Sequence, residues 1–453
     1  MALFEKVKDK NKKNKLNSKE NATHENTYIN KLIEHYKTRI LKETNLELLT
    51  SLSIGEMRLR IEQLISQFMS EEKVVVPRKD KELLISRIID ESVGFGPLES
   101  LLNDPAITEI LINGYKEVYI EKAGRLMKTN IVFKDDQHIR HIVDRIVAPI
   151  GRRIDESNPM VDARLPDGSR VNAVIAPVSL NGTLVSIRKF RAEPFTIEDL
   201  LNFNSIHPPM AVFLEAVVKA KVNILISGGT GSGKTTLLNV LGSMIPEGER
   251  VITIEDSAEL KLDKSNVVGL EARPPNVEGK GEITIRHLVK NALRMRPDRI
   301  IVGEVRGSEA FDMLQAMNTG HEGSITTVHA NSPFDALSRI EGMVIMAGMD
   351  LPASIIREYI VGALDIIVQG ERLTDGTRKI TSICEIITNE KNEFEINEIF
   401  KFQRTGLTAE EGVEGYYTAT GLIPKCVDRL KTYGLELPMH IFHERINLSI
   451  PKT

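Results

Sequence analysis

Apolar side chains recur at helical spacing in three stretches near the start of the chain. Within each stretch they fall three or four positions apart and form one stripe on a helix. Such stripes are typical of helices that bury one face against each other, so we predict a small helical bundle over residues 27–92. The stripe positions are Ile29, Leu32, Ile33, Tyr36 and Ile40, then Ile54, Met57, Ile61, Leu64, Ile65 and Phe68, then Ile85, Ile89 and Val93.

The pattern changes after Gly94-Phe95-Gly96-Pro97, where short strand-like runs replace the helical stripes. Asp167-Gly168 lies between two such runs and is a typical hairpin turn. Ile139 to Ile146 has the spacing of a single helix. We therefore predict an α+β domain over residues 93–192.

A proline-marked linker with one short helix is predicted over residues 193–210. From residue 211 onwards helices and buried strands alternate, which indicates an α/β domain with a mainly parallel sheet and crossover helices. Two strand pairs, around Asp375-Gly376 and Glu390-Lys391-Asn392, predict a C-terminal extension of this domain, which reaches residue 453.

Composition narrows the class of protein. The 453 residues are 41% hydrophobic and 27% charged, as in globular proteins, which excludes a disordered, collagen-like or disulfide-scaffold chain. The two cysteines, Cys384 and Cys426, fit a reducing compartment and are too few for a four-cysteine zinc site. No stretch has the apolar length that a membrane span or a signal peptide needs.

Charge adds one local feature. The formal net charge is −4, but basic residues dominate the first twenty positions. We expect a disordered basic tail over residues 1–26, with loose attraction to acidic lipid or an acidic partner as the alternative. Because the remainder is acidic, nucleic acid is not the expected partner.

One motif carries specific chemistry. Residues 228–235 match the phosphate-loop pattern G-x-x-x-x-G-K-[ST] in full, between a predicted strand and a predicted helix. Backbone N–H groups of such a loop point at phosphate oxygens, and the helix adds its positive end. Lys234 is expected to reach the β- and γ-phosphates, and the Thr235 hydroxyl to ligate Mg²⁺ directly. The predicted nucleotide-binding residues are Gly228, Gly229, Thr230, Gly231, Ser232, Gly233, Lys234, Thr235 and Thr236.

Two carboxylates follow predicted strands. Glu255 opens an acidic box after Val251 to Ile254, where it orients water or holds Mg²⁺ through water, or else merely starts a helix. Glu304 follows Ile300 to Val302, with Gly303 where an aspartate is more usual. We expect Glu304 to serve the Mg²⁺ water shell, the attacking water, or both.

Histidines and arginines complete the candidates. His321 and His329 lie eight positions apart and are structural, contact the γ-phosphate or link subunits; the zinc-protease spacing is absent, so no zinc is expected. Arginines that neutralise phosphate charge accelerate phosphoryl transfer about 10³- to 10⁵-fold. Six arginines cluster in the second half of the α+β domain, as a charged surface or as such a source of charge: Arg152, Arg153, Arg164, Arg170, Arg188 and Arg191.

These motifs together resemble the type II/IV secretion ATPases, and within them the CpaF/TadA-type motors of Flp (Tad) pilus assembly. The resemblance runs from about Gly94 to the C-terminus, and leaves the helical region before it uncovered. The residues that carry it are Gly96-Pro97-Leu98-Glu99, Glu109 to Gly114, Gly151 to Glu156, Val161 to Asn172, the phosphate loop, the acidic box (Glu255 to Glu259), Val302 to Gly307 and the histidine-containing segment Thr319 to His329.

The resemblance implies a cytoplasmic homo-hexamer on the inner face of the cytoplasmic membrane. Each subunit pairs an N-terminal, PAS-like α+β domain with a RecA-like ATPase domain, and ATP with Mg²⁺ sits in the cleft between them. It assigns Glu255, Glu304 and His329 to catalysis, with Glu304 on Mg²⁺ through water. It also makes four of the arginines candidates for a phosphate clamp, namely Arg164, Arg170, Arg188 and Arg191. The partners it implies are inner-membrane platform proteins.

The sequence motifs are compatible with more than one function. The expected function is ATP hydrolysis that drives pilus assembly, with retraction left open. A related traffic ATPase for protein secretion or DNA transfer would use the same chemistry, and a slow nucleotide-gated scaffold would barely turn over. A helicase is disfavoured because no basic groove studded with aromatic residues is evident.

Overall fold

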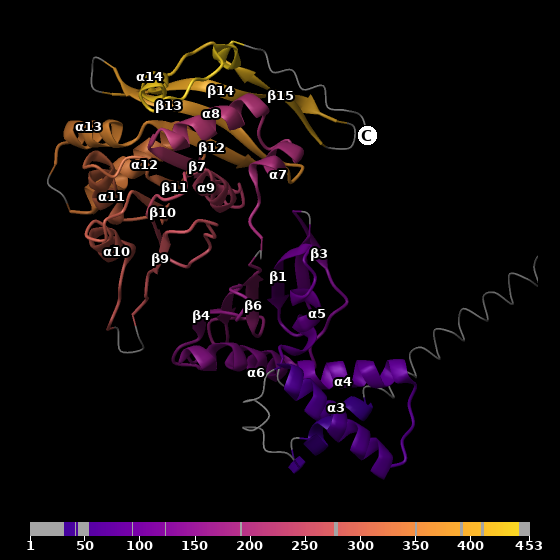
Figure 1. Ribbon diagram of the computed structural model, residues 1–453. Helices are drawn as coiled ribbons and strands as arrows, with labels where there is room; N and C mark the ends of the chain where they lie inside the picture. Colours follow the sequence, from indigo (N-terminus) through magenta and orange to yellow (C-terminus); the bar gives the residue numbers. More distant parts are fainter. Residues whose placement is uncertain are drawn as a thin grey trace, which may run out of the picture. The chain divides into compact units, whose positions relative to one another are not determined.

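The chain forms two compact units, Met1–Phe190 and Arg191–Thr453, each described here by itself (Figure 1). The computed structural model describes residues 31–40, 42–43, 54–92, 94–122, 124–190, 193–275, 280–348, 351–389, 393–408 and 412–443. The predicted tail over residues 1–26 and the candidate Arg191 lie outside these residues. No helix among the described residues combines the length and the apolar character that crossing a bilayer requires.

The predicted helices near the start are present. Residues 31–40 are helical, followed by α3 (Ile54–Glu71) and α4 (Arg78–Ser92). Their stripes share one core, in which the rings of Tyr36 and Phe68 stack with centroids 6.4 Å apart. At the positions whose burial is described, the spacing of apolar residues therefore identified the buried faces of these helices correctly. The burial of Ile29, Ile54, Met57 and Val93 lies outside the described part of the chain.

An antiparallel six-stranded sheet follows, in the order β3-β2-β1-β6-β5-β4. The apolar face of α6 packs into the core of this sheet, and the side chain of Asp135 caps the helix by accepting the N–H of His138 at 2.8 Å. Asp167-Gly168 turns between β4 and β5, as predicted. The elements are η1 (Gly96–Leu98), α5 (Glu99–Leu102), β1 (Ile107–Asn113), β2 (Val118–Lys122), β3 (Arg125–Lys128), α6 (Asp136–Val147), η2 (Ala148–Ile150), β4 (Met160–Arg164), β5 (Arg170–Val174) and β6 (Leu184–Arg188).

The second unit is built on a nine-stranded sheet in the order β15-β14-β13-β12-β7-β11-β10-β8-β9. The six strands β12, β7, β11, β10, β8 and β9 are parallel neighbours. Strands β13 to β15 continue the sheet beyond β12 as an antiparallel meander. The strands are β7 (Ile224–Gly228), β8 (Val251–Glu255), β9 (Val267–Glu271), β10 (Arg299–Val305), β11 (Ile325–His329), β12 (Ile366–Arg372), β13 (Arg378–Thr388), β14 (Phe394–Leu407) and β15 (Val413–Ala419).

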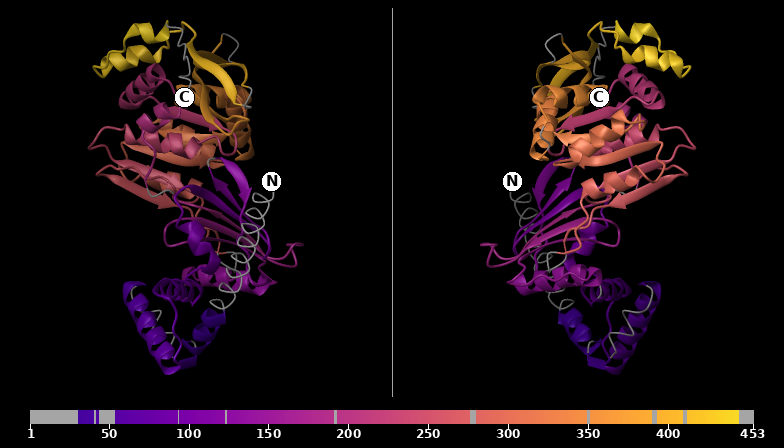
Figure 2. Two further views of the ribbon diagram at one scale, coloured as in Figure 1. Left: turned by 90° about the vertical axis from the view of Figure 1, so that its right-hand side faces the viewer. Right: turned by 90° about the vertical axis from the view of Figure 1, so that its left-hand side faces the viewer.

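Helices cover both faces of this sheet, because the parallel strands are apolar on both sides. Ile224 and Ile226 pack with α8, α9 and α14 on one face, while Leu225 packs with α10 to α13 on the other. Helix α14, yellow in Figure 2, lies beside α8. The helices are α7 (Ile197–Asn202), α8 (Pro208–Lys219), α9 (Lys234–Ser243), α10 (Ile285–Ala292), α11 (Glu309–Asn318), α12 (Pro333–Met346), α13 (Ala353–Ala363), α14 (Cys426–Thr432) and η3 (Met439–Phe442).

The segment predicted as a linker contributes to the second unit. Helix α7 begins with a capping box made by Thr196 and Asp199. Leu200 and Ile206 are buried in the same core as α8 and β7. The short predicted helix is thus present, and its apolar side is part of the α/β core.

Candidate functional site

Four adjacent strands bring the predicted residues of the second unit to one edge of its sheet. Strands β7, β11, β10 and β8 are parallel neighbours in that order. β7 ends at Gly228, β11 ends at His329, β10 carries Glu304 near its end, and β8 ends at Glu255. Because carboxyl ends of parallel strands meet at one edge, motifs far apart in the sequence lie together.

The phosphate loop connects β7 to α9 and depends on a close approach at Gly228. A Cβ atom on this residue would lie 2.4 Å from Ser232 Oγ and 2.6 Å from the carbonyl oxygen of Gly370. Only glycine fits between them. The loop then ends at Gly233, whose φ of 94° lies in the left-handed region, directly before the first turn of α9.

The loop residues fit a phosphate ligand with Mg²⁺. Lys234 Nζ donates to the carbonyl oxygens of Gly228 and Gly229, at 3.0 and 3.1 Å, so its charge lies over the loop. Ser232 is buried, and among the described residues its hydroxyl has no hydrogen-bond partner. An ammonium group, a free hydroxyl and a helix N-terminus suit phosphate oxygens, and the Thr235 hydroxyl is of the kind that ligates Mg²⁺.

The position of Glu255 explains why a glycine, Gly303, precedes Glu304 in β10. The register pairs Ile254 with Val302, so Glu255 lies beside Gly303, where a Cβ atom would be 2.9 Å from Glu255 Cγ. The side chain of Glu255 thus fills the space that an aspartate in β10 would need.

The carboxylate of Glu255 is 5% exposed and accepts the backbone N–H of Glu259 at 2.8 Å and that of Leu260 at 3.1 Å. The alternative interpretation, in which the acidic box starts a helix, is wrong, since residues 256–266 contain no helix.

Glu304 is held by an arginine that the sequence analysis did not single out. Its Oε2 accepts Arg306 Nη2 at 2.7 Å, and Arg306 Nη1 lies 3.3 Å from Asp256 Oδ2. The hydrogen bond to Glu304 raises the pKa of Arg306. With its side chain 25% exposed, Glu304 is open to solvent, unlike Glu255.

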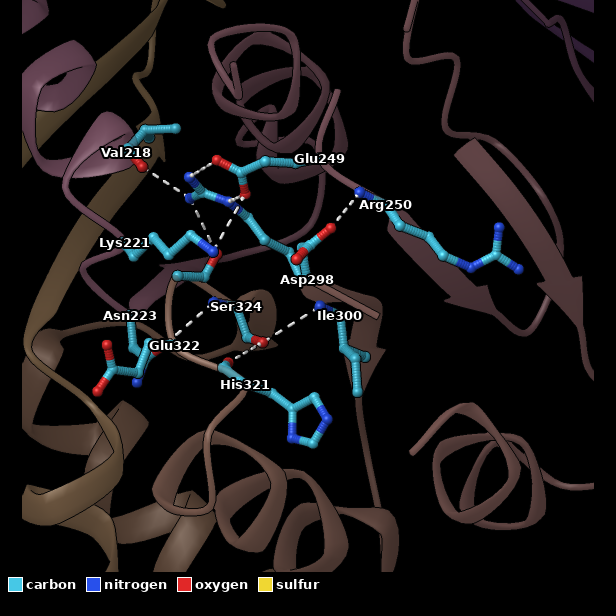
Figure 3. Close-up of polar contacts among 12 residues, drawn as sticks. Val218, Lys221, Asn223, Glu249, Arg250, Asp298, Ile300, His321, Glu322 and Ser324 are labelled. Atoms are coloured by element: carbon cyan, nitrogen blue, oxygen red, sulfur yellow. Dashed lines mark hydrogen bonds and ion pairs between the residues drawn. The ribbon is translucent and has the colours of Figure 1, made fainter. Parts of the chain in front are cut away.

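The two histidines lie at opposite ends of β11. His329 pairs in register with Gly228, next to the phosphate loop. His321 precedes the strand, and its carbonyl oxygen accepts the Ser324 hydroxyl, which in turn accepts the N–H of Ile300 at the start of β10 (Figure 3). Eight residues span the whole five-residue strand, so of the roles left open for His321, contact with a phosphate in the loop of the same unit does not fit its place.

Three of the predicted arginines form a row in the first unit. Arg164 pairs with Arg170 across β4 and β5, and Arg170 pairs with Arg188 across β5 and β6. Directly opposed residues share one face of a sheet. Arg188 also pairs with Glu109 of β1, so the row ends at a carboxylate, and the cross-strand register makes the three arginines one cationic stripe.

Two arginines that lie beside the phosphate loop were not predicted from the sequence. Arg372 and Arg378 flank the β12–β13 turn and pair with each other. Arg378 Nε donates to the carbonyl oxygen of Gly231 at 2.8 Å. The turn itself was predicted from Asp375-Gly376, but no local signal indicates that β12 adds to the sheet beside β7.

Comparison with known proteins gives consistent matches. Residues 91–420 match the family described as "Type II/IV secretion system protein". A Mycobacterium tuberculosis protein with the name "Putative conjugal transfer protein" is 38% identical over 313 residues, covering 67% of this chain and 88% of that protein. The type IV secretion system protein VirB11 of Bartonella quintana is 32% identical over 337 residues, covering 66% and 93%.

A crystal structure of the VirB11 ATPase of Brucella suis in complex with sulphate is 31% identical, covers 64% of this chain and 95% of its own, and has a TM-score of 0.35. The family match extends from α4 to the end of the antiparallel meander, well over half of the chain. The chain therefore belongs to the type II/IV secretion system protein family.

Proposed function

We propose that this chain is a motor ATPase that hydrolyses ATP at the carboxyl edge of the nine-stranded sheet. The observation that carries the proposal is the convergence of the phosphate loop, His329, Glu304 and Glu255 on four adjacent parallel strands. A phosphate loop alone binds nucleotide, whereas carboxylates at the neighbouring strand ends add the groups that hydrolysis needs.

The residues divide the work by exposure and chemistry. Lys234 and the loop N–H groups bind the β- and γ-phosphates. Glu304, the more exposed carboxylate, orients the attacking water, and Glu255 supports it from the adjacent strand. His329 contacts the terminal phosphate. Thr235, and Glu304 through water, would hold Mg²⁺, which would neutralise charge on the phosphate oxygens.

The arginine row supplies the remaining charge. Arg164, Arg170 and Arg188 lie side by side on three strands, and Arg191 follows shortly after in the sequence. A cationic stripe of this kind suits the negative charge that builds up on the transferred phosphoryl group. We assign these arginines the role of a phosphate clamp, provided by the same subunit or by a neighbour.

The physiological role that we propose is assembly of Tad/Flp-type pili. The subunits form a homo-hexamer on the cytoplasmic face of the inner membrane and act on platform proteins there. The support is the resemblance of the motifs to the pilus-assembly motors. Neighbouring genes for a prepilin, a prepilin peptidase and polytopic platform proteins would support this cargo.

A second candidate is the traffic of DNA or protein through a type IV secretion system. The relatives described as a conjugal transfer protein and as VirB11 favour it. It needs the same site and differs in the cargo alone. Neighbouring genes for a conjugation pore instead of a prepilin would decide for this candidate.

The first test is ATPase activity per subunit as a function of protein concentration, with Glu304→Gln as the blank. We expect activity to rise as the chain assembles, because a ring completes each site with charge from a neighbour, and to fall by at least about 10²-fold in the variant. Activity that is constant across a confirmed range from monomer to oligomer would remove the ring from the mechanism. ATP binding without turnover would favour a nucleotide-gated scaffold.

A further inference from the structure

A hairpin outside the recognised motifs lies against the phosphate loop. β12 runs parallel to β7, with Gly370 opposite Gly228. Two residues further on, Arg372 ends the strand, and Arg378 begins β13 directly opposite it. Both side chains are exposed. The register of the sheet therefore places two arginines just beyond the end of β7, where the phosphate loop begins.

Both arginines approach the middle of the loop. Arg378 Nε donates to the carbonyl oxygen of Gly231 at 2.8 Å. Arg372 Nη1 lies 3.5 Å from the position that a Cβ atom on Gly231 would occupy, and Arg378 Cδ lies 3.6 Å from the equivalent position on Gly233. The hairpin thus touches the loop at the two glycines that flank Ser232.

The hydrogen bond to Gly231 fixes the direction of the next N–H group. In a trans peptide the C=O and the following N–H point to opposite sides of the chain. With the carbonyl oxygen of Gly231 turned toward Arg378, the N–H of Ser232 is turned away from the hairpin. It makes a long contact of 3.4 Å with the carbonyl oxygen of Gly229, which also accepts Lys234 Nζ.

A peptide at this position needs such a restraint. Gly231 has a φ of 70°, and glycine adopts positive and negative φ almost equally well, so its peptide can reorient. A hydrogen bond from a charged donor is stronger than a neutral one and holds the carbonyl in place.

The hairpin itself is anchored. In the turn of the hairpin, Asp375 Oδ2 accepts the N–H of Val413 at 2.9 Å. Glu371 on β12 forms an ion pair with Arg404 on β14 at 2.5 Å. Leu373 is buried. Contacts therefore connect the phosphate loop to the hairpin, and the hairpin to the rest of the antiparallel meander.

We propose that Arg378 is a positioning residue of the phosphate loop, which orients the Ser232 N–H toward the β-phosphate by fixing the Gly231 carbonyl from the β12–β13 hairpin. The proposal rests on the function proposed above, because it presumes a nucleotide in the loop. It makes the C-terminal meander part of the nucleotide site, since the loop keeps its binding shape through a contact with that meander.

The test compares affinities of the full chain for ADP and for inorganic pyrophosphate, each with Mg²⁺, by titration calorimetry. Arg378→Gln removes the charged donor, and Arg339→Gln, at an exposed position of α12, is the control. Lys234→Ala reports the loss of the loop itself. We expect Arg378→Gln to weaken both ligands about 10-fold or more, as the loss of a charged hydrogen bond does, and Arg339→Gln to bind as the wild type.

Thermal midpoints separate positioning from folding. Because Arg378 is exposed, Arg378→Gln is expected to unfold within about 2 °C of the wild type, as surface substitutions do, and Arg378→Lys, which keeps a cationic donor, to regain part of the affinity. Wild-type affinity in Arg378→Gln would overturn the proposal. A large fall in its thermal midpoint would also overturn it, because the weaker binding would then reflect partial unfolding. Failure of the wild type itself to bind ADP would overturn the proposed function, and this inference with it.

Discussion

At the scale of single residues, Gly303 on one strand and Glu255 on the neighbouring strand fit each other. Gly303 has no side chain, and Glu255 on β8 fills the space beside it. The carboxylate is then held by two backbone N–H groups of its own loop. A glycine in place of an aspartate is thus compensated by a glutamate from the adjacent strand.

This close fit predicts the effect of Gly303→Ala. The added methyl group would lie 2.9 Å from Glu255 Cγ, so Glu255 must move away from its two N–H donors. We expect a loss of about 1–3 kcal/mol in the free energy of unfolding and about a 10²-fold lower kcat, measured by urea unfolding and steady-state ATPase assays.

The matched control is Gly342→Ala in α12, where nothing lies within 4 Å of the added atom. There alanine is expected to stabilise the helix by roughly 0.5–1 kcal/mol. A fully active Gly303→Ala enzyme would show that the position of Glu255 is unimportant.

How far the site could be predicted depends on how local each signal is. The phosphate loop follows from eight consecutive residues, and Glu304 from a strand that ends in a carboxylate. His321 and His329 are equivalent in the sequence, and only the length of β11 separates them. Arg378 reaches Gly231 across 147 residues, a contact that depends on strand order and leaves no mark in either segment.

At the scale of elements, a buried arginine joins the amino ends of the parallel strands to α8. Arg299, fully buried at the start of β10, donates from Nε and Nη2 to the two carboxylate oxygens of Glu249, at 2.7 and 3.0 Å. Its Nη1 donates to the carbonyl oxygen of Val218 at 2.6 Å (Figure 3). One guanidinium group thus fastens a strand, a helix end and a loop.

Glu249→Gln is therefore expected to be costly, because it leaves the buried charge of Arg299 without its counterion. We expect a loss of about 3–5 kcal/mol in the free energy of unfolding of the second unit, measured by urea unfolding. The same substitution at Glu215, which pairs with Lys219 on the surface of α8, is expected to cost less than about 1 kcal/mol. Equal effects at the two sites would contradict a special role for the buried pair.

The elements themselves were predictable where the pattern is strong and short-ranged. The stripes of α3 and the buried run of β7 were recognised. β9 is only half buried, at the edge of the sheet, and lacks the continuous apolar run of its neighbours. β11 was missed because two threonines, buried against the carbonyl oxygens of β10, interrupt its apolar pattern.

At the scale of the whole molecule, the two units contain different groups of candidate catalytic residues. The second unit holds the phosphate loop and the carboxylates, whereas the first holds the arginine row of β4, β5 and β6. If the row acts as a phosphate clamp, catalysis needs both units, and binding of ADP needs mainly the second.

Arg170→Ala tests this division of labour, because Arg170 is the middle member of the row. We expect kcat to fall about 10³-fold, as on removal of an arginine that stabilises transferred phosphate, while the affinity for ADP changes little. Arg125→Ala, on the exposed edge strand β3 of the same sheet, is the control. Unchanged turnover in Arg170→Ala would contradict the clamp.

The position of β7 between β11 and β12 has a consequence for the synthesis of the chain. The N–H of Asn223, just before β7, is accepted by Asp365, just before β12, which lies 142 residues later. At about 5–20 residues per second, a ribosome needs roughly 7–30 s to deliver the partner after β7 has emerged. During that interval the strand leading to the phosphate loop has an open edge, and the nascent chain depends on avoiding wrong pairings there until β12 arrives.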